Sequence, residues 1–193
     1  MKDAFNSHHW VVNRIFRKYE IRELSAEELK VSWEEPYMIF FKKYLPKLDI
    51  EEIQSAYREG VSDKGYPEAG AFPGIVALIK KIKNRGDYVA VITSDLPDSF
   101  FPELKRFNLD SVFDDVVTKV HEKSDALREL INKNSLDFDN TYIVGDSYNE
   151  IMAGKELGVK SVAVTWGLNM EQKLRNKNPD YVVRNIVELE KII

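Results

Sequence analysis

The stretch TYIVGDSYNEIMAG, residues 141–154, decides the fold. A short apolar strand, Tyr142–Val144, runs into Gly145, and Asp146 and Glu150 follow at the start of a helix. Open α/β sheets bind ligands at the carboxyl ends of their parallel strands, where these two acids are expected to lie. Carboxylate oxygens suit Mg²⁺ that carries a phosphate group. The alternative is that both acids only stabilise the helix dipole.

The rest of the chain changes its pattern near Gly70. Before this residue the sequence predicts four helices and no strand, with the helices at residues 10–21, 25–33, 34–45 and 49–61. After it, helices alternate with apolar strands, expected at residues 88–94, 113–118, 141–146, 161–167 and from 181 onward. Apolar strands separated by helices indicate a parallel sheet covered on both faces. We predict an α/β fold, with a helical cap over residues 1–68 and a doubly wound parallel sheet over residues 69–193.

The composition is that of a globular protein. The chain has 193 residues, of which 44% are hydrophobic and 31% charged, and its net charge is -4. This acidity speaks against a nucleic-acid partner, and the absence of cysteine excludes disulfides, thiolate chemistry and zinc–sulfur sites. No apolar run reaches the ~20 residues that cross a bilayer. The first ten residues also lack the apolar centre of a signal peptide, so we predict a cytoplasmic protein without a membrane partner.

Two further places carry candidate ligand-binding residues. Thr93 and Ser94 end a predicted strand, where a hydroxyl and the next backbone N–H can cradle a phosphate. The alternative is that Ser94 or Asp95 caps the following helix. Lys123 precedes a helix after the next predicted strand. It is either a solvated surface charge or a cation that neutralises a phosphate and a buried carboxylate.

The order of hydroxyl, lysine and acid pair resembles the haloacid dehalogenase-like (HAD) hydrolase superfamily, and within it the phosphoglycolate-phosphatase-like branch. FPGIVALIKKIKNRGDYVAVITSD, residues 72–95, resembles the approach to the second family motif. GDSYNEIMAGKELGVKSVAVTWG, residues 145–167, resembles the fourth motif with its following helix and strand. The resemblance covers nearly the whole chain, because the helical first part resembles the inserted cap domain. It implies a HAD-like Rossmannoid core and a Mg²⁺-dependent phosphatase that acts on a small phosphorylated metabolite.

The resemblance also implies a role for each candidate residue. Thr93 and the Ser94 backbone would bind the transferring phosphate, and Lys123 would be the catalytic cation that also contacts it. Asp146 would ligate Mg²⁺. Glu150 would support the metal shell, at a position where many relatives have aspartate. Chemistry of this kind depends mainly on electrostatic stabilisation and positioning.

The family's aspartate nucleophile and general acid/base stand on its first strand, in a D-x-D-G run. MKDAFNSHHWVVN, the start of this chain, resembles the segment just after that run, with Asp3 in the place of a "DS" pair. We therefore expect the first strand and both aspartates to precede Met1, and the chain as written to be inactive. None of Asp3, Asp95 and Asp98 is favoured as a substitute. The alternative function is a non-catalytic protein that binds a phosphorylated ligand or a partner protein.

A phosphoacceptor receiver-like domain also uses acids, a hydroxyl and a lysine. Its acids come first along the chain and its lysine last, unlike the order here. The sequence does not separate a phosphatase from a phosphomutase. The substrate would depend on side chains within Phe5–Gly70. His8 and His9 are candidate substrate contacts there, or else polar surface at a helix start.

The absent first strand has a structural consequence. In the family this strand lies between the strands that end at Thr93 and Asp146, so its loss would leave two facing edges unpaired. A buried backbone group without a partner costs about 1–3 kcal/mol. We therefore expect the two strands to pair directly or another segment to fill the gap, and we expect exposed edges to favour self-association.

Overall fold

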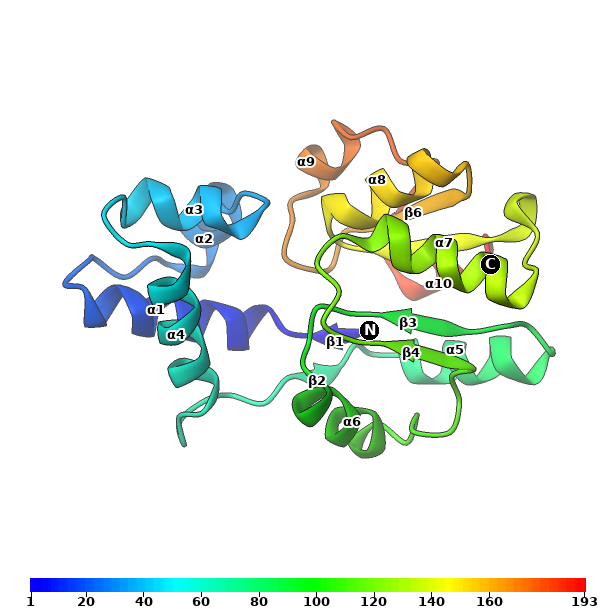
Figure 1. The fold of residues 1–193 in the computed structure, drawn as a ribbon, viewed down its shortest axis with the longest axis horizontal. Coiled ribbons are helices and arrows are strands. Elements are labelled where there is room, and N and C mark those ends of the chain that lie inside the picture. The colour runs from blue at the N-terminus through cyan, green and yellow to red at the C-terminus, as the bar shows by residue number, and fades with distance from the viewer. The chain divides into compact units, whose positions relative to one another are not determined.

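The computed structural model describes residues 1–193 and divides into two compact units, each drawn in Figure 1. The helical unit consists of residues 2–70 and 167–170. The α/β unit consists of Met1, residues 71–166 and residues 171–193. The segment 167–170, which the sequence pattern assigns to the sheet domain, therefore lies with the helices.

The helical unit is built from four helices. They are α1 (Phe5–Lys18), α2 (Ala26–Ser32), α3 (Tyr37–Tyr44) and α4 (Ile50–Val61). The predicted capping box at the start of α2 is confirmed, because the Ser25 side chain accepts the Glu28 backbone N–H and the Glu28 side chain accepts the Ser25 backbone N–H. Asp49 and Glu52 form a second capping box at the start of α4.

A core of aromatic and aliphatic side chains holds these helices together. Its largest fully buried members are Phe16, Phe40, Phe41, Ile15, Leu29 and Ile53. Burying one such side chain contributes about 1.5–3 kcal/mol. Helices of this length are marginal in water by themselves, so this shared core is what makes them stable.

The α/β unit alternates strands and helices along the chain. Its strands are β3 (Ala90–Ile92), β4 (Asp115–Val117), β5 (Tyr142–Gly145), β6 (Lys160–Val164) and β7 (Tyr181–Val183). Its helices are α5 (Ile75–Asn84), α6 (Pro97–Arg106), α7 (Lys123–Asn134), α8 (Tyr148–Leu157), α9 (Glu171–Arg175) and α10 (Ile186–Glu190), with a 3-10 turn at Phe138–Asn140. Every strand pair in this unit is parallel, which confirms the predicted α/β class. No helix of the chain has the length and apolar character needed to cross a membrane.

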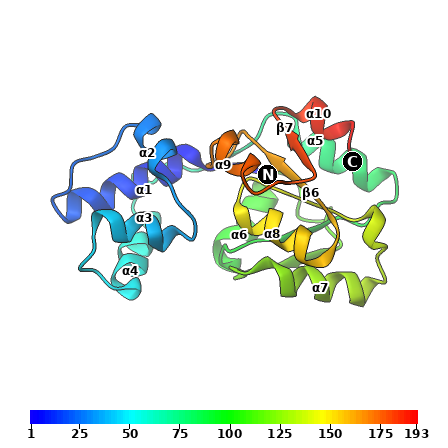
Figure 2. The ribbon, with the colours of Figure 1, turned by 90° about the horizontal axis from the view of Figure 1, so that it is seen from above.

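Helices cover both faces of the strands, as predicted. Along β6, Val162 and Val164 pack in one cluster with residues of α5 and α10, whereas Ala163 packs with residues of α8 and α9. Figure 2 shows α5 and α10 together on one side of the strands and α7 and α8 on the opposite side. This alternation of side chains explains why β6 reads as a continuous apolar run in the sequence.

The strands form two separate sheets instead of the single expected sheet. β3 pairs only with β4, and the second sheet has the order β5-β6-β7. β3 and β5 do not pair with each other, and no strand lies between them. The expectation that these two strands pair directly is therefore wrong, and no other segment of this chain joins them as a strand. β3 and β5 each keep one edge without a paired strand.

One short pairing was also not expected. β1 (Lys2–Asp3) pairs with β2 (Gly70–Ala71) in a sheet of its own. The Phe72 backbone N–H donates to the Met1 carbonyl at 3.0 Å beside it. The prediction of a first part without strands is wrong here, because two residues are too few to show the alternation from which strands are predicted.

Candidate functional site

The predicted site residues come from turns at the carboxyl ends of parallel strands in the α/β unit. Thr93 and Ser94 follow β3, and Asp146 follows β5. Lys123 is the first residue of α7, and Glu150 lies in the first turn of α8. The structure brings two of them, Lys123 and Glu150, into direct contact.

Lys123 and Glu150 form an ion pair that is almost closed to solvent. Their side chains are 16% and 8% exposed. The Glu150 carboxylate also accepts the Ser147 backbone N–H at 3.0 Å, which completes a capping box at the start of α8. Burial opposes the charge of Glu150, but the neighbouring Lys123 charge and the hydrogen bonds from Lys123 and Ser147 hold its pKa below the ordinary value. Glu150 is therefore ionised, and its carboxylate interacts with Lys123 and the Ser147 backbone N–H.

Gly145 provides the space in which Glu150 folds back over the end of β5. A Cβ added at Gly145 would lie 2.5 Å from the Glu150 Cδ, a distance that real Cβ atoms essentially never show. The requirement for glycine is one of space, since any side chain would displace the carboxylate. The sequence motif Gly-Asp followed by an acid thus has a packing reason as well as a chemical one.

The turn after β3 is closed by Thr93 and Asp95. The Thr93 hydroxyl donates to the Asp95 carboxylate and accepts the Asp95 backbone N–H, both at 3.1 Å. Ser94 is exposed between them. The helix-capping alternative is wrong, because the N-cap of α6 is Leu96 and no side chain caps it. A phosphate at the Thr93 hydroxyl would replace the Asp95 carboxylate as its partner.

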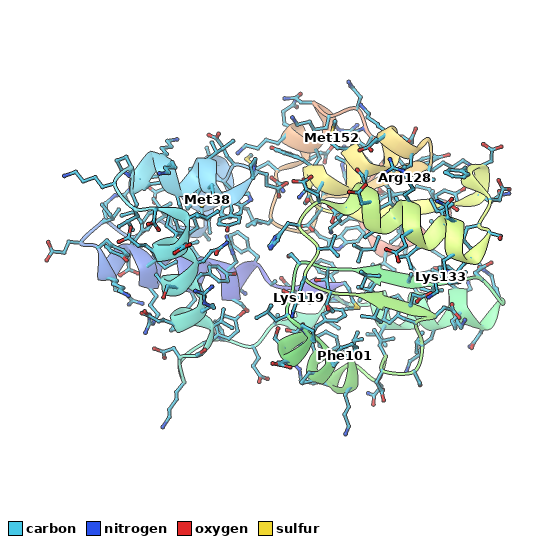
Figure 3. The ribbon with its side chains drawn as sticks, in the orientation of Figure 1. Met38, Phe101, Lys119, Arg128, Lys133 and Met152 are labelled. Atoms are coloured by element: carbon cyan, nitrogen blue, oxygen red, sulfur yellow. The ribbon has the colours of Figure 1, made fainter.

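Lys119 lies beside this turn, although its place in the sequence does not predict a role for it. Its backbone N–H donates to the Asp95 carbonyl at 3.0 Å, and the Val120 N–H donates to the Thr93 carbonyl at 2.9 Å. Lys119 has a φ of 62°, an uncommon conformation for a residue with a side chain. Figure 3 shows it in the loop that follows β4. Nothing in the sequence distinguishes it from the other 27 of the 28 basic residues.

The residues present do not make a complete metal site. Nowhere in the chain do three His, Cys, Asp or Glu side chains gather in a way that could hold a metal ion. Of the two predicted ligands, Glu150 is directed to Lys123 and Ser147. This leaves Asp146 as the predicted ligand at the end of β5, and one carboxylate by itself does not complete a metal site.

His8 is partly buried in the helical unit, where its ring packs against aromatic side chains, so the polar-surface interpretation is wrong for it. Its ring meets Trp33 edge-on with 4.4 Å between ring centroids, and its Nδ1 lies 3.4 Å from the Tyr57 hydroxyl. Its Nε2 is buried and has no hydrogen-bond partner. Burial, and next the charge of His9, lower the pKa of His8 to about 4. His9 differs, because its Nε2 contacts the Leu24 carbonyl at 2.7 Å.

Comparison with known sequences gives one family. The model of the family described as haloacid dehalogenase-like hydrolase matches residues 3–164. Pyrophosphatase PpaX from Halalkalibacterium halodurans is 28% identical over 158 residues, which are 79% of this chain and 73% of that protein. Phosphoglycolate phosphatase from Vibrio cholerae is 28% identical over 157 residues, which are 77% of this chain and 69% of that protein.

Solved structures share the fold of the whole chain. A haloacid dehalogenase-like family hydrolase from Streptococcus pneumoniae has a TM-score of 0.82 at 21% identity, and the match covers 100% of this chain and 92% of that one. A protein from Clostridium acetobutylicum, described as a predicted phosphatase, has a TM-score of 0.83 at 24% identity, with 100% and 92% covered. At these identities the similarity shows the fold alone.

Proposed function

Because the chain belongs to the haloacid dehalogenase-like hydrolase family, we propose that its site serves a phosphatase reaction on a small phosphorylated metabolite. The observation that carries the proposal is the buried Lys123–Glu150 pair at the carboxyl ends of the strands. The names of two relatives suggest the compounds to test first, pyrophosphate and phosphoglycolate.

In this proposal Lys123 is the group that binds and polarises the phosphate. Glu150 is a positioning residue, because it holds the lysine and does not itself face the substrate. A cation fixed before the substrate arrives stabilises developing negative charge without any reorganisation. The Thr93 hydroxyl and the Ser94 backbone N–H supply the remaining contacts to phosphate oxygens.

The cofactor in this proposal is Mg²⁺. Phosphatases of this family generally use a divalent metal. Mg²⁺ keeps several waters and binds through one or two carboxylates together with the phosphate of the substrate. Asp146 is the carboxylate we assign to it. We assign Glu150, which contacts Lys123, to the support of that lysine instead of the metal shell. With one carboxylate, these residues hold Mg²⁺ only weakly when no phosphate is bound.

The site residues described above do not include a nucleophile. The acids at the site have other partners, since Asp95 is bonded to Thr93, and Glu150 to Lys123 and Ser147. We propose that catalysis requires an aspartate on an added strand, as the D-x-D-G run of the family implies. The same observation favours a second candidate function, a protein that binds phosphorylated ligands without hydrolysing them.

One experiment separates the two functions. Phosphate release from pyrophosphate and phosphoglycolate is measured with Mg²⁺ for the chain as given and for a version extended at Met1 by an apolar strand ending in D-x-D-G. The phosphatase proposal expects release near background without the extension, and measurable release with it that Thr93→Ala abolishes. A matched version with both aspartates of the run changed to Asn controls for the added strand. Brisk release by the unextended chain would contradict the assignment of the missing nucleophile, and no release by any version would favour the binding protein.

A further inference from the structure

A solvent-open groove of about 460 Å³ lies between α1 and α4 in the helical unit. Its walls carry an indole, three cations and two carboxylates, which belong to Trp10, Arg14, Arg17, Lys18, Glu59 and Asp63. Figure 1 shows α1 and α4 side by side, and the two helices are in contact. The volume is within the range of about 300–1,000 Å³ that small-molecule sites have. No residue of this groove belongs to the candidate site described above.

The groove side chains of α1 form one row along the helix. Trp10, Arg14, Arg17 and Lys18 stand at positions i, i+4, i+7 and i+8, which share a face of an α-helix. With a rise of about 1.5 Å per residue, Trp10 and Arg17 are about 10 Å apart along the axis. The opposite face is buried in the core of the unit through Val11, Val12, Ile15 and Phe16. The exposed row therefore has an aromatic ring at one end and cations at the other.

Both carboxylates of the groove are paired, and the pairs leave N–H groups of Arg14 unused. Lys18 donates to Glu59 at 2.8 Å, and the Arg14 Nε donates to Asp63 at 3.1 Å. Asp63 also accepts the Gly65 backbone N–H at 2.8 Å, so the turn after α4 holds this carboxylate in place. The Arg14 guanidinium makes no other hydrogen bond in the chain, and both of its amino groups are available to a ligand.

Arg17 is the cation of the groove with the weakest partner. Its side chain is 54% exposed, and the one carboxylate within 4 Å of it, that of Glu23, lies at 3.6 Å. Exposed ion pairs contribute only about 0–1 kcal/mol, so an anionic ligand can replace Glu23 at little cost. A guanidinium presents its N–H groups as a fork that fits two oxygens of a phosphate. Two such groups on one helix face, in a chain of net charge -4, favour an anion with more than one phosphate.

Trp10 adds an aromatic surface to these cations. Its indole is partly exposed and meets the Tyr66 ring edge-on, with 6.1 Å between ring centroids. Gly65 lies close beside it, because a Cβ added there would be 3.3 Å from the Trp10 Cζ2. These neighbours hold the indole at the groove. A nucleic-acid base stacked on such a ring gains about 1–3 kcal/mol.

We propose that this groove is a binding site for a nucleoside di- or triphosphate, with the base against Trp10 and the phosphates on the amino groups of Arg14 and Arg17. The combination carries the choice of ligand, since an inorganic phosphate would make no use of the indole and an uncharged aromatic compound would make no use of the cations. The groove does not involve Lys123. The proposal therefore holds whether or not the protein is a phosphatase.

The test is a titration with ADP, without Mg²⁺, followed by the indole N–H signals of the three tryptophans in NMR spectra. We expect the Trp10 signal, assigned with a Trp10→Phe variant, to shift, and the signal of Trp33, which is 4% exposed, to stay. Trp166 reports on the α/β unit. Arg17→Met should weaken ADP binding at least about tenfold. Lys43→Met, which removes an exposed cation from α3, is the control and should bind as the wild type does.

The same Trp10 signal follows titrations with pyrophosphate and with adenosine, and both should bind at least about tenfold more weakly than ADP. Pyrophosphate bound as tightly as ADP would make the groove a phosphate site and overturn the nucleotide assignment. A shift of Trp166 alone, or loss of ADP binding in the Lys123→Met/Glu150→Gln variant, would place the nucleotide in the α/β unit.

No shift of the Trp10 signal at millimolar ADP would show that the row on α1 is only a solvated helix face. None of these measurements depends on hydrolysis. The nucleotide proposal can therefore fail while the phosphatase proposal stands, and the reverse.

Discussion

The Lys123 ammonium and the Glu150 carboxylate are paired beneath the surface, where α7 and α8 begin. The pair joins two helices whose first residues are 25 positions apart in the sequence (148 − 123), and it fixes a cation at the end of a parallel sheet. Replacing one partner of a buried ion pair by a neutral residue leaves the other charge uncompensated. The pair can therefore be tested by measuring the free energy of unfolding alone.

Lys123→Met is expected to destabilise the α/β unit by about 3–5 kcal/mol, because Glu150 stays buried without its partner. The Lys123→Met/Glu150→Gln double variant should recover a large part of this loss. Urea denaturation of the three proteins measures both effects. Lys81→Met is the matched control, since its ion pair with Glu190 is exposed and such pairs contribute about 0–1 kcal/mol. A single variant as stable as the wild type would mean that the pair is not closed to solvent.

Gly145→Ala is expected to push Glu150 away from Lys123, because the new Cβ would overlap the Glu150 side chain. Overpacking of this kind costs about 1–3 kcal/mol. Gly70→Ala is the control, since nothing lies within 4 Å of a Cβ at that position. The two variants are compared by thermal melting. If both melt at the wild-type temperature, the close packing of Glu150 over Gly145 is not maintained in solution.

The free energy of unfolding should decrease as the pH is lowered through a window set by the pKa of His8. Its folded pKa of about 4 lies below the ordinary 6.5, so between these values the unfolded chain binds the proton that the folded chain excludes. Folding therefore loses stability as pH falls from about 6.5 to 4, by roughly 3 kcal/mol for a difference of this size. Glu150 has a lowered pKa for a different reason, its ionic partner: its stabilisation is complete above its ordinary pKa of 4.5 and is lost only below it.

The His8→Phe variant tests this window, because phenylalanine fills a similar space without titrating. Denaturation followed by tryptophan fluorescence measures the stability at each pH, and Trp33, whose ring meets that of His8, contributes to the signal. The variant should show a flatter stability profile between pH 6.5 and 4. Parallel profiles for wild type and His8→Phe would refute the buried neutral state of His8.

The fold class and most helices could be predicted from the sequence because their signals are local. The capping box at Ser25 and Glu28 and the apolar run of β6 depend only on neighbouring residues. The division into two sheets could not be predicted in this way, because it depends on which strands, far apart in the sequence, form backbone hydrogen bonds with each other. The five residues of α9 and the two of β1 are too short for a periodic pattern to show.

For the candidate site, the sequence predicts which residues stand near strand ends, but not the contacts that they make. Strand ends indicate that Thr93, Lys123 and Asp146 belong to one edge of the sheet. Lys123 and Glu150, which form an ion pair, are 27 positions apart in the sequence. The hydrogen bond between Thr93 and Asp95 depends on the exact conformation of the turn. Neither contact can be predicted from a local sequence pattern. This is why the sequence pattern assigns Glu150 to the metal, whereas the structure pairs it with the lysine.

Isothermal titration of orthophosphate tests the central claim, a phosphate site built around Lys123, most directly. The Lys123→Met/Glu150→Gln variant keeps the buried site neutral and folded, and Lys133→Met removes a lysine from the other end of the same helix as a control. We predict that wild type and Lys133→Met bind phosphate with the same affinity, and that the double variant binds at least about tenfold more weakly, the equivalent of about 1.4 kcal/mol. Equal affinity in all three proteins would contradict the claim.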